Sequence, residues 1–177
     1  MMRLPTMPSL GDSGFLLRPI ELTDIPAWYC YLAMPHVIEH TSWDLHSADD
    51  LKAIITSSNT DDANSPLRLA IVETATNNFV GTIGFPIISS ANRTAELAYD
   101  LHPNYWGKGI ASLCAKALVH WAFTEGKFVR IQATVLDTNL ASANVLKKIG
   151  FVFEGKLKNY RIVRGQPRDY AMFSATS

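Results

Sequence analysis

The sequence predicts an α/β fold whose elements follow the order β-α-α-β-β-β-α-β-α-β-β. Residues 94–101 alternate between apolar and polar side chains, which predicts a strand, and from Ile110 onward the apolar residues recur at helical spacing. A glycine-containing turn joins this strand to this helix. A chain of 177 residues with 47% hydrophobic residues suits one domain with a sizeable core. We therefore expect a single domain over residues 15–177, after a loose lead-in at residues 1–14.

The elements before residue 94 are predicted from caps, breakers and apolar spacing. In chain order, they are a strand over residues 15–18 closed by Pro19, a helix capped by Thr23 or Asp24, a helix capped by Ser47, and a hairpin of residues 68–73 and 79–88. Pro26 fits the first turn of the first helix, where its missing N–H costs nothing. Residues 36–45 carry no clear pattern.

The elements after the long helix are also predicted from alternation, capping residues and turn residues. They are a strand over residues 128–136, a helix opened by residues 137–139, and the last strands over residues 151–156 and 161–173, joined around Gly165-Gln166-Pro167. Gly150 is well placed to end the second helix in a left-handed cap. We find no internal repeat and no linker that would divide the chain.

The turn Trp106-Gly107-Lys108-Gly109 is a candidate anion cradle. Two glycines let the backbone approach a ligand closely, and the free amides of the following helix end carry a partial positive charge. Such a site suits phosphate or pyrophosphate. The alternative is a tight turn with no ligand, because short glycine motifs are weak signals.

Composition limits the classes of partner. The net charge is zero, which gives no reason to expect nucleic acid, and no apolar run approaches the roughly 20 residues that span a bilayer. Cys30 and Cys114 match no metal or redox spacing, so we expect buried, reduced thiols in a cytoplasmic protein. Residues 1–100 carry a net charge of −7 (5 basic, 12 acidic) and residues 101–177 carry +7 (11 basic, 4 acidic). This uneven charge distribution fits a protein that joins a polyphosphate cofactor to a cationic substrate. The alternative is that the charged residues lie on solvent-exposed surfaces and serve no common function.

The order of elements and three local motifs resemble the GCN5-related N-acetyltransferases (GNAT). The closest branch is the RimJ/RimL type, whose enzymes acetylate the amino termini of ribosomal proteins. The motifs are Ala95-Glu96-Leu97-Ala98-Tyr99, Tyr105-Trp106-Gly107-Lys108-Gly109-Ile110-Ala111, and Asn139-Leu140-Ala141-Ser142 followed by Ile149-Gly150-Phe151. The resemblance implies a mixed, mostly antiparallel central sheet of about seven strands with helices on both faces.

The resemblance also implies acetyl-CoA as the cofactor. The family's phosphate-loop pattern, Gln/Arg-x-x-Gly-x-Gly/Ala, falls on residues 104–109, where Asn104 replaces the usual Gln or Arg and weakens the expected phosphate contact. The implied cofactor-binding residues are Tyr99, Asp100, Leu101, Asn104, Tyr105, Trp106, Gly107, Lys108, Gly109, Ile110, Ala111, Asn139 and Ser142. For Asn139, a plain helix N-cap is an equally good and compatible interpretation.

The implied reaction is direct attack of a primary amine on the thioester carbonyl in a ternary complex. Glu96 is the candidate base, directly or through a water, with a structural pairing to an Arg or Lys of a neighbouring strand as the alternative. A backbone amide near Tyr99 to Leu101 is the candidate oxyanion donor. The family's usual thiolate-protonating Tyr falls on Leu146, so Ser142 is the expected thiol partner, with Tyr160 as a second candidate.

The expected acceptor is a protein N-terminal α-amine, with a small amine such as a polyamine, aminoglycoside or amino acid as the alternative. Glu39, His40 and Trp43 are candidate substrate-binding residues, although core and capping roles explain them equally well. Competing functions are a catalytically silent acyl-CoA-binding protein, a nucleotide-binding module, and a zinc protease suggested by His36-Val37-Ile38-Glu39-His40. We expect no metal site. We also expect an exposed edge strand near the C-terminus, which would permit a homodimer.

Overall fold

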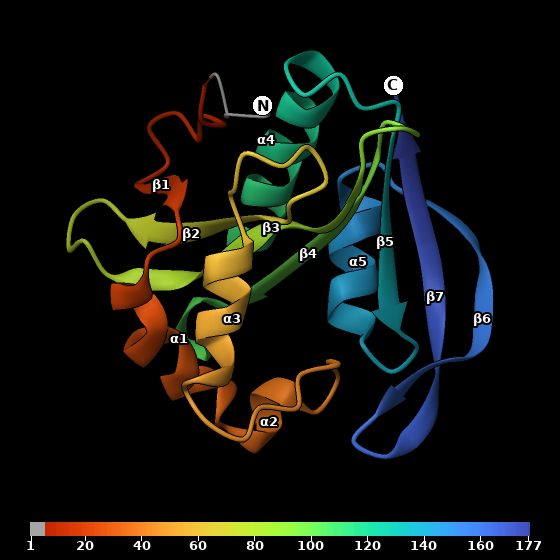
Figure 1. Cartoon of the computed structure of the whole chain (residues 1–177), viewed down its shortest axis with the longest axis horizontal. Coiled ribbons are helices and arrows are strands. Elements are labelled where there is room, and N and C mark those ends of the chain that lie inside the picture. Colours follow the sequence, from red (N-terminus) through yellow and green to blue (C-terminus); the bar gives the residue numbers. More distant parts are fainter. Residues whose placement is uncertain (1–5) are drawn as a thin grey trace.

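The computed structural model describes residues 6–177, and these form one seven-stranded sheet of order β1-β2-β3-β4-β5-β7-β6 (Figure 1). The strands are β1 (Phe15–Pro19), β2 (Leu67–Glu73), β3 (Phe79–Ser89), β4 (Thr94–Leu101), β5 (Arg130–Leu136), β6 (Val152–Val163) and β7 (Gln166–Thr176). Within the described residues, β4 and β5 form the one parallel pair, and the other neighbours are antiparallel. The predicted mixed, mostly antiparallel sheet is confirmed.

Helices cover both faces of this sheet. They are α1 (Ile25–Leu32), α2 (Pro35–Ile38), α3 (Asp50–Ser57), α4 (Ile110–Thr124) and α5 (Leu140–Lys148). Strand β2 shows how the faces divide: Leu69 and Ile71 join the core with α4 and α5, whereas Ala70 and Val72 join the core with α1 and α3. Successive side chains of a strand point to opposite faces, so β2 is buried on both.

The sheet opens between β4 and β5. Their parallel register covers only Thr94 to Glu96 in the described chain, after which the two strands separate (Figure 1). On the other side of β4, an extra residue of β3 near Pro86 shifts the register and bends the strand pair. The divergence leaves one edge of residues 97–101 facing a gap in the middle of the sheet.

The direction of the β4 backbone groups follows from two hydrogen bonds. The His102 N–H donates to Val80 O on the β3 side, while Arg93 O accepts from the Val129 N–H on the β5 side. Because these groups alternate along a strand, the backbone N–H and C=O of Tyr99 and Leu101 point toward β5. They therefore face the gap.

Four local expectations differ from the structure. Ser47 does not cap α3; instead, Asp50 Oδ2 accepts from the backbone N–H groups of His46 and Ser47, at 2.8 and 3.1 Å. Residues 157–160 continue β6 instead of forming a loop, because β6 absorbs two register shifts against β7. The predicted loose lead-in contains Leu10, which is buried in the main core, while residues 1–5 lie outside the described residues. Cys30 is exposed on the outer side of α1, so only Cys114 has the predicted burial.

Candidate active site

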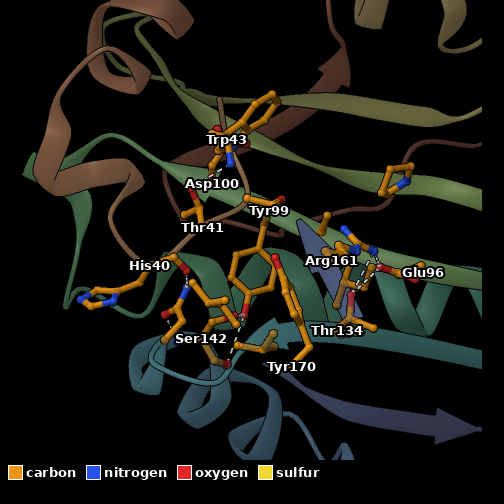
Figure 2. A pocket seen from close by; sticks show the side chains of 18 of the residues that line it. His40, Thr41, Trp43, Glu96, Tyr99, Asp100, Thr134, Ser142, Arg161 and Tyr170 are labelled. Atoms are coloured by element: carbon orange, nitrogen blue, oxygen red, sulfur yellow. Dashed lines mark hydrogen bonds and ion pairs between the residues drawn. The ribbon is translucent and has the colours of Figure 1, made fainter. Parts of the chain in front are cut away.

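The gap between β4 and β5 forms a cavity of about 250 Å³ (Figure 2). It brings together seven residues singled out from the sequence: His40, Trp43, Glu96, Tyr99, Asp100, Asn139 and Ser142. Residues that the sequence did not single out complete the walls, among them Arg68, Thr134, Arg161 and Tyr170. The strand separation thus creates one site from segments that lie up to 130 residues apart, as from His40 to Tyr170.

Glu96 is buried in this cavity and is held by two donors. Its Oε1 accepts from Thr134 Oγ1 of β5 at 2.7 Å and from Arg161 Nη2 of β6 at 2.9 Å (Figure 2). Arg161 also donates to Thr134 Oγ1 at 3.2 Å, which closes a three-residue network. Within the described chain, no hydrogen bond reaches Glu96 Oε2. One carboxylate oxygen is therefore fixed and the other is available to a ligand.

Asp100 lies in a second buried network at another wall of the cavity. Trp28 Nε1 and the Tyr31 hydroxyl donate to its Oδ1, and Thr82 Oγ1 donates to its Oδ2 at 2.7 Å. Arg68 Nη1 donates to Thr82 Oγ1 at 3.1 Å and lies 3.9 Å from Asp100 Oδ2. Burial raises the pKa of Asp100 and lowers that of Arg68, while their mutual attraction opposes both shifts. Both Asp100 oxygens are occupied, so this carboxylate holds α1 to the sheet.

Tyr99 and Ser142 form a hydroxyl pair across the gap. The two hydroxyl oxygens lie 2.9 Å apart, and the Tyr99 hydroxyl also lies 3.3 Å from the Ser142 carbonyl oxygen (Figure 2). Burial raises the pKa of Tyr99 to about 12, so its phenol is protonated at neutral pH. The Ser142 N–H donates to Asn139 Oδ1 at 3.0 Å, which makes Asn139 the N-cap of α5. The cap thereby fixes the start of α5, and with it Ser142.

Residues 39–43, here called the lip, are held from two sides, and residues 40–43 of this segment border the cavity. Asn139 Nδ2 donates to His40 O at 3.0 Å, and His40 Nδ1 lies 3.1 Å from Thr138 Oγ1. From the β6–β7 turn, Arg164 donates to Trp43 O at 2.7 Å, to Thr41 O at 3.2 Å and to Glu39 O at 3.3 Å. Trp43 itself packs edge-on against Trp28, with ring centroids 5.7 Å apart.

The glycine turn lies at the N-terminus of α4, beyond the end of β4. Gly107 and Gly109 adopt positive φ values of 72° and 79°, which glycine accepts without strain, and open space surrounds both positions. Trp106 Nε1 donates to Leu101 O at 2.9 Å and ties the turn to the strand. Lys108 lies over the Tyr105 ring, with its Nζ 5.3 Å from the centroid. Residues 104–111 do not line the cavity, so this turn and the cavity are two neighbouring parts of the site.

Two candidates lie outside the cavity. Glu39 borders a separate shallow hollow with Arg164. Tyr160 is 41% exposed, and its ring packs against Tyr170 with centroids 5.6 Å apart. Of these two stacked tyrosines, Tyr170 of β7 borders the cavity, and the sequence analysis did not single it out.

Among residues 6–177, no three His, Cys, Asp or Glu side chains cluster closely enough to hold a metal ion. His36, part of the zinc-like motif, instead packs against the Trp106 ring at 6.1 Å. No helix in this part of the chain is long and apolar enough to cross a membrane.

Comparisons with known proteins place these features in a wider group. Residues 15–152 match the sequence model of the acetyltransferase (GNAT) domain family. The chain is 32% identical over 172 residues to the uncharacterized N-acetyltransferase p20 of Bacillus licheniformis, covering 95% of this chain and 96% of that protein. It is 29% identical to the spermidine N(1)-acetyltransferase of Escherichia coli, over 50% of this chain and 48% of the relative. Mycobacterium smegmatis RimJ in complex with CoA-disulfide has a similar fold, with a TM-score of 0.79, 28% identity, and coverage of 92% of this chain and 82% of that one.

Proposed function

Because the chain belongs to the family of GNAT acetyltransferases, we propose that it acetylates the α-amine at the N-terminus of a protein or peptide. The reaction class follows from the family: an N-acetyltransferase that uses acetyl-CoA as the donor. The choice of acceptor is the proposal.

The observation that carries the proposal is the supply of hydrogen-bonding groups in the cavity. Both Asp100 oxygens and Glu96 Oε1 already accept hydrogen bonds, which leaves Glu96 Oε2 as the one carboxylate oxygen of the described cavity that is free for an amine. Unused donors are more numerous, since Arg161 binds Glu96 and Thr134 through Nη2 alone. An α-aminoacyl group, with one amine and an adjacent carbonyl oxygen, matches this supply.

A polyamine acceptor matches it less well. A polycation needs several unpaired carboxylates, because each ammonium that leaves water requires a partner. Here each cavity carboxylate lies beside an arginine: Glu96 beside Arg161 and Asp100 beside Arg68. The cavity volume of about 250 Å³ also falls below the range of about 300–1,000 Å³ for pockets that enclose a drug-sized ligand. It suits the end of a chain better than a whole extended amine.

Glu96 Oε2 is the group placed to take the proton of the attacking amine, directly or through one water. An α-amine with a pKa near 8 is about 10% neutral at pH 7, so the base removes a proton mainly as the amine attacks. Thr134 and Arg161 hold the carboxylate in one orientation through Oε1. Pre-organisation of this kind lowers the cost of reaching the reactive geometry.

The donor side of the reaction uses the open edge of β4. In our proposal the pyrophosphate of acetyl-CoA binds the amides around Gly107 and Gly109, and the pantetheine arm runs along Tyr99 to Leu101 as an added strand. The Tyr99 backbone N–H, which points into the gap, then donates to the thioester oxygen as negative charge develops there. Ser142 lies across the gap and supplies the proton for the departing thiolate. Tyr99 positions Ser142 through the hydroxyl pair.

A comparison of acceptors tests the proposal. Release of the CoA thiol is followed with a panel of short peptides that differ in their first two residues, and with spermidine, a free amino acid and an aminoglycoside. We expect kcat/KM for the best peptide to exceed that for spermidine by at least ten-fold. Preferential turnover of spermidine would reject the α-amine assignment while leaving the acetyltransferase class intact.

A further inference from the structure

The Tyr170 hydroxyl is a buried polar group that no group in residues 6–177 meets with the geometry of a hydrogen bond, although the Ser42 hydroxyl lies close enough to lower its pKa. The residue is 3% exposed, and the hydroxyl is one of two such side-chain atoms in this part of the chain. The other, Trp121 Nε1, belongs to α4 and lies outside the cavity walls. Tyr170 does line the cavity, and Figure 2 shows its ring reaching into the space between Tyr99 and Arg161.

The surroundings of Tyr170 hold its ring in place. Its backbone lies in the middle of β7, opposite Leu136 of β5 on one side and Leu157 of β6 on the other. The Tyr160 ring packs on it at 5.6 Å between centroids, and the Arg161 guanidinium lies 5.4 Å from its ring centroid. A buried phenol fixed by strand pairing and by two side chains has little freedom to turn toward another partner.

An unsatisfied buried hydroxyl is normally destabilising, so such a group at the wall of a site indicates a ligand atom as its partner. Burial raises the pKa of Tyr170, although Arg161, Ser42 and other nearby groups oppose the shift. The phenol is therefore protonated at neutral pH and acts as a donor. An acceptor atom on the ligand is its natural partner.

We propose that Tyr170 is a specificity-determining residue whose hydroxyl donates a hydrogen bond to the carbonyl oxygen next to the reacting α-amine. This inference rests on the proposed function, because it places the amine at Glu96 Oε2. Both Tyr170 and Glu96 border the same cavity, and Arg161 contacts both of them. In an α-aminoacyl group the carbonyl carbon is bonded to the carbon that carries the amine, so the two polar groups enter the cavity together.

The proposed hydrogen bond from Tyr170 would both bind a peptide acceptor and discriminate against amines that lack the carbonyl oxygen. An acceptor that lacks the carbonyl oxygen leaves the phenol unpaired, and a site built to bind a polar atom rejects analogues that lack it. A polyamine at neutral pH carries hydrogen-bond donors and no acceptor, so it cannot accept a hydrogen bond from the Tyr170 hydroxyl. Tyr170 and the paired carboxylates therefore select for the same acceptor class.

The test uses the Tyr170→Phe variant and two matched acceptors. One is the best peptide of the panel, and the other carries a trans-alkene in place of its first peptide bond, which keeps the shape and removes the carbonyl oxygen. We expect Tyr170→Phe to lower kcat/KM for the peptide about ten-fold, the effect of a lost hydrogen bond worth about 1.4 kcal/mol, and to leave that of the alkene analogue within two-fold. KM for acetyl-CoA should not change. Tyr29→Phe, which removes a hydroxyl on α1 outside the cavity, serves as the control.

Different results would reject the proposed function and the proposed role of Tyr170. Turnover of spermidine but of no peptide by the wild type rejects the proposed function before any variant is made. A wild-type preference for the peptide over the alkene that Tyr170→Phe retains overturns the role of Tyr170 alone. An equal loss with both acceptors also overturns it, because partial misfolding or a general packing defect lowers both rates together and leaves their ratio unchanged.

Discussion

Arg161 Nη2 lies 2.9 Å from Glu96 Oε1, although the two residues are 65 positions apart and come from β6 and β4. The pair joins the two halves of the sheet at the point where the gap begins, since Glu96 is the last residue of β4 that pairs with β5. It leaves Glu96 with one held oxygen and one available oxygen. A merely structural ion pair and a base held in position predict different results when Glu96 is changed.

The variant Glu96→Gln tests the base directly. Glutamine keeps the shape and the Oε1 acceptor for Thr134 and Arg161 but cannot take a proton. We expect kcat to fall about 10²- to 10³-fold, within the range for general-base catalysis, and the Kd for acetyl-CoA to stay within two-fold. Steady-state kinetics and calorimetry measure the two quantities. A variant with lowered thermal stability and unchanged kcat would assign Glu96 a structural role.

The Tyr99 and Ser142 hydroxyls should act as one unit. Tyr99→Phe removes the hydroxyl that pairs with Ser142 Oγ, and Ser142→Ala removes the group that we place against the thiolate. We expect each variant to lower kcat about five- to ten-fold, and the double variant to lower it no further than Ser142→Ala alone. A double-mutant cycle measures this coupling. Independent, multiplying losses would mean that the two hydroxyls serve separate steps.

Arg164 should control acceptor binding through residues 39–43. Its guanidinium donates to three backbone carbonyls of that lip, so Arg164→Ala releases the segment from the β6–β7 turn. We expect KM for the peptide acceptor to rise about five- to ten-fold, the cost of about 1–1.4 kcal/mol of lost hydrogen bonding, with KM for acetyl-CoA unchanged. Lys158→Ala removes an exposed cation of β6 and is the matched control. An equal rise in both KM values would point to a general loss of structure.

Glu154 should make part of the fold's stability depend on pH. Hydrogen bonds from Arg130 and Ser174 lower its pKa from 4.5 to about 2. A carboxyl whose folded pKa is depressed stabilises the fold above its unfolded pKa, and this contribution is lost as the pH falls from about 4.5 toward 2. The wild type should therefore resist urea better than Glu154→Gln at pH 6, with the difference shrinking by pH 2.5. Glu125→Gln, an exposed carboxyl at the end of α4, should show no such pattern.

Local chemistry explains what could be predicted from the sequence. The strand ending at Leu101, the turn at Gly107 and the helix beginning at Ile110 each depend on residues near in sequence, and each element occurs where its pattern predicts it. The N-cap of Asn139 is equally local and is confirmed. Glu96, Tyr99 and Ser142 are candidates because they fall in the motifs that resemble the GNAT family, and the structure brings all three to one cavity.

Long-range pairing explains the rest. A single sequence does not reveal that Arg161 is the cation that meets Glu96, or that Arg68 and Asp100 share a buried network. Tyr170 was not among the candidates, and that it borders the cavity while Tyr160 does not depends on pairing of this kind as well. Register shifts at Gly155 and between Leu157 and Arg161 break the simple alternation of β6, so side-chain direction cannot be extrapolated along that strand.

The site of acetylation on a peptide that carries both a free α-amine and an internal lysine tests the central claim most directly. The peptide is incubated with acetyl-CoA and the enzyme, and fragmentation mass spectrometry locates the added group. We predict acetyl on the α-amine alone, and loss of that product with Glu96→Gln. Acetyl on the lysine side chain, or an acetylated α-amine that persists with Glu96→Gln at the wild-type rate, would contradict the account.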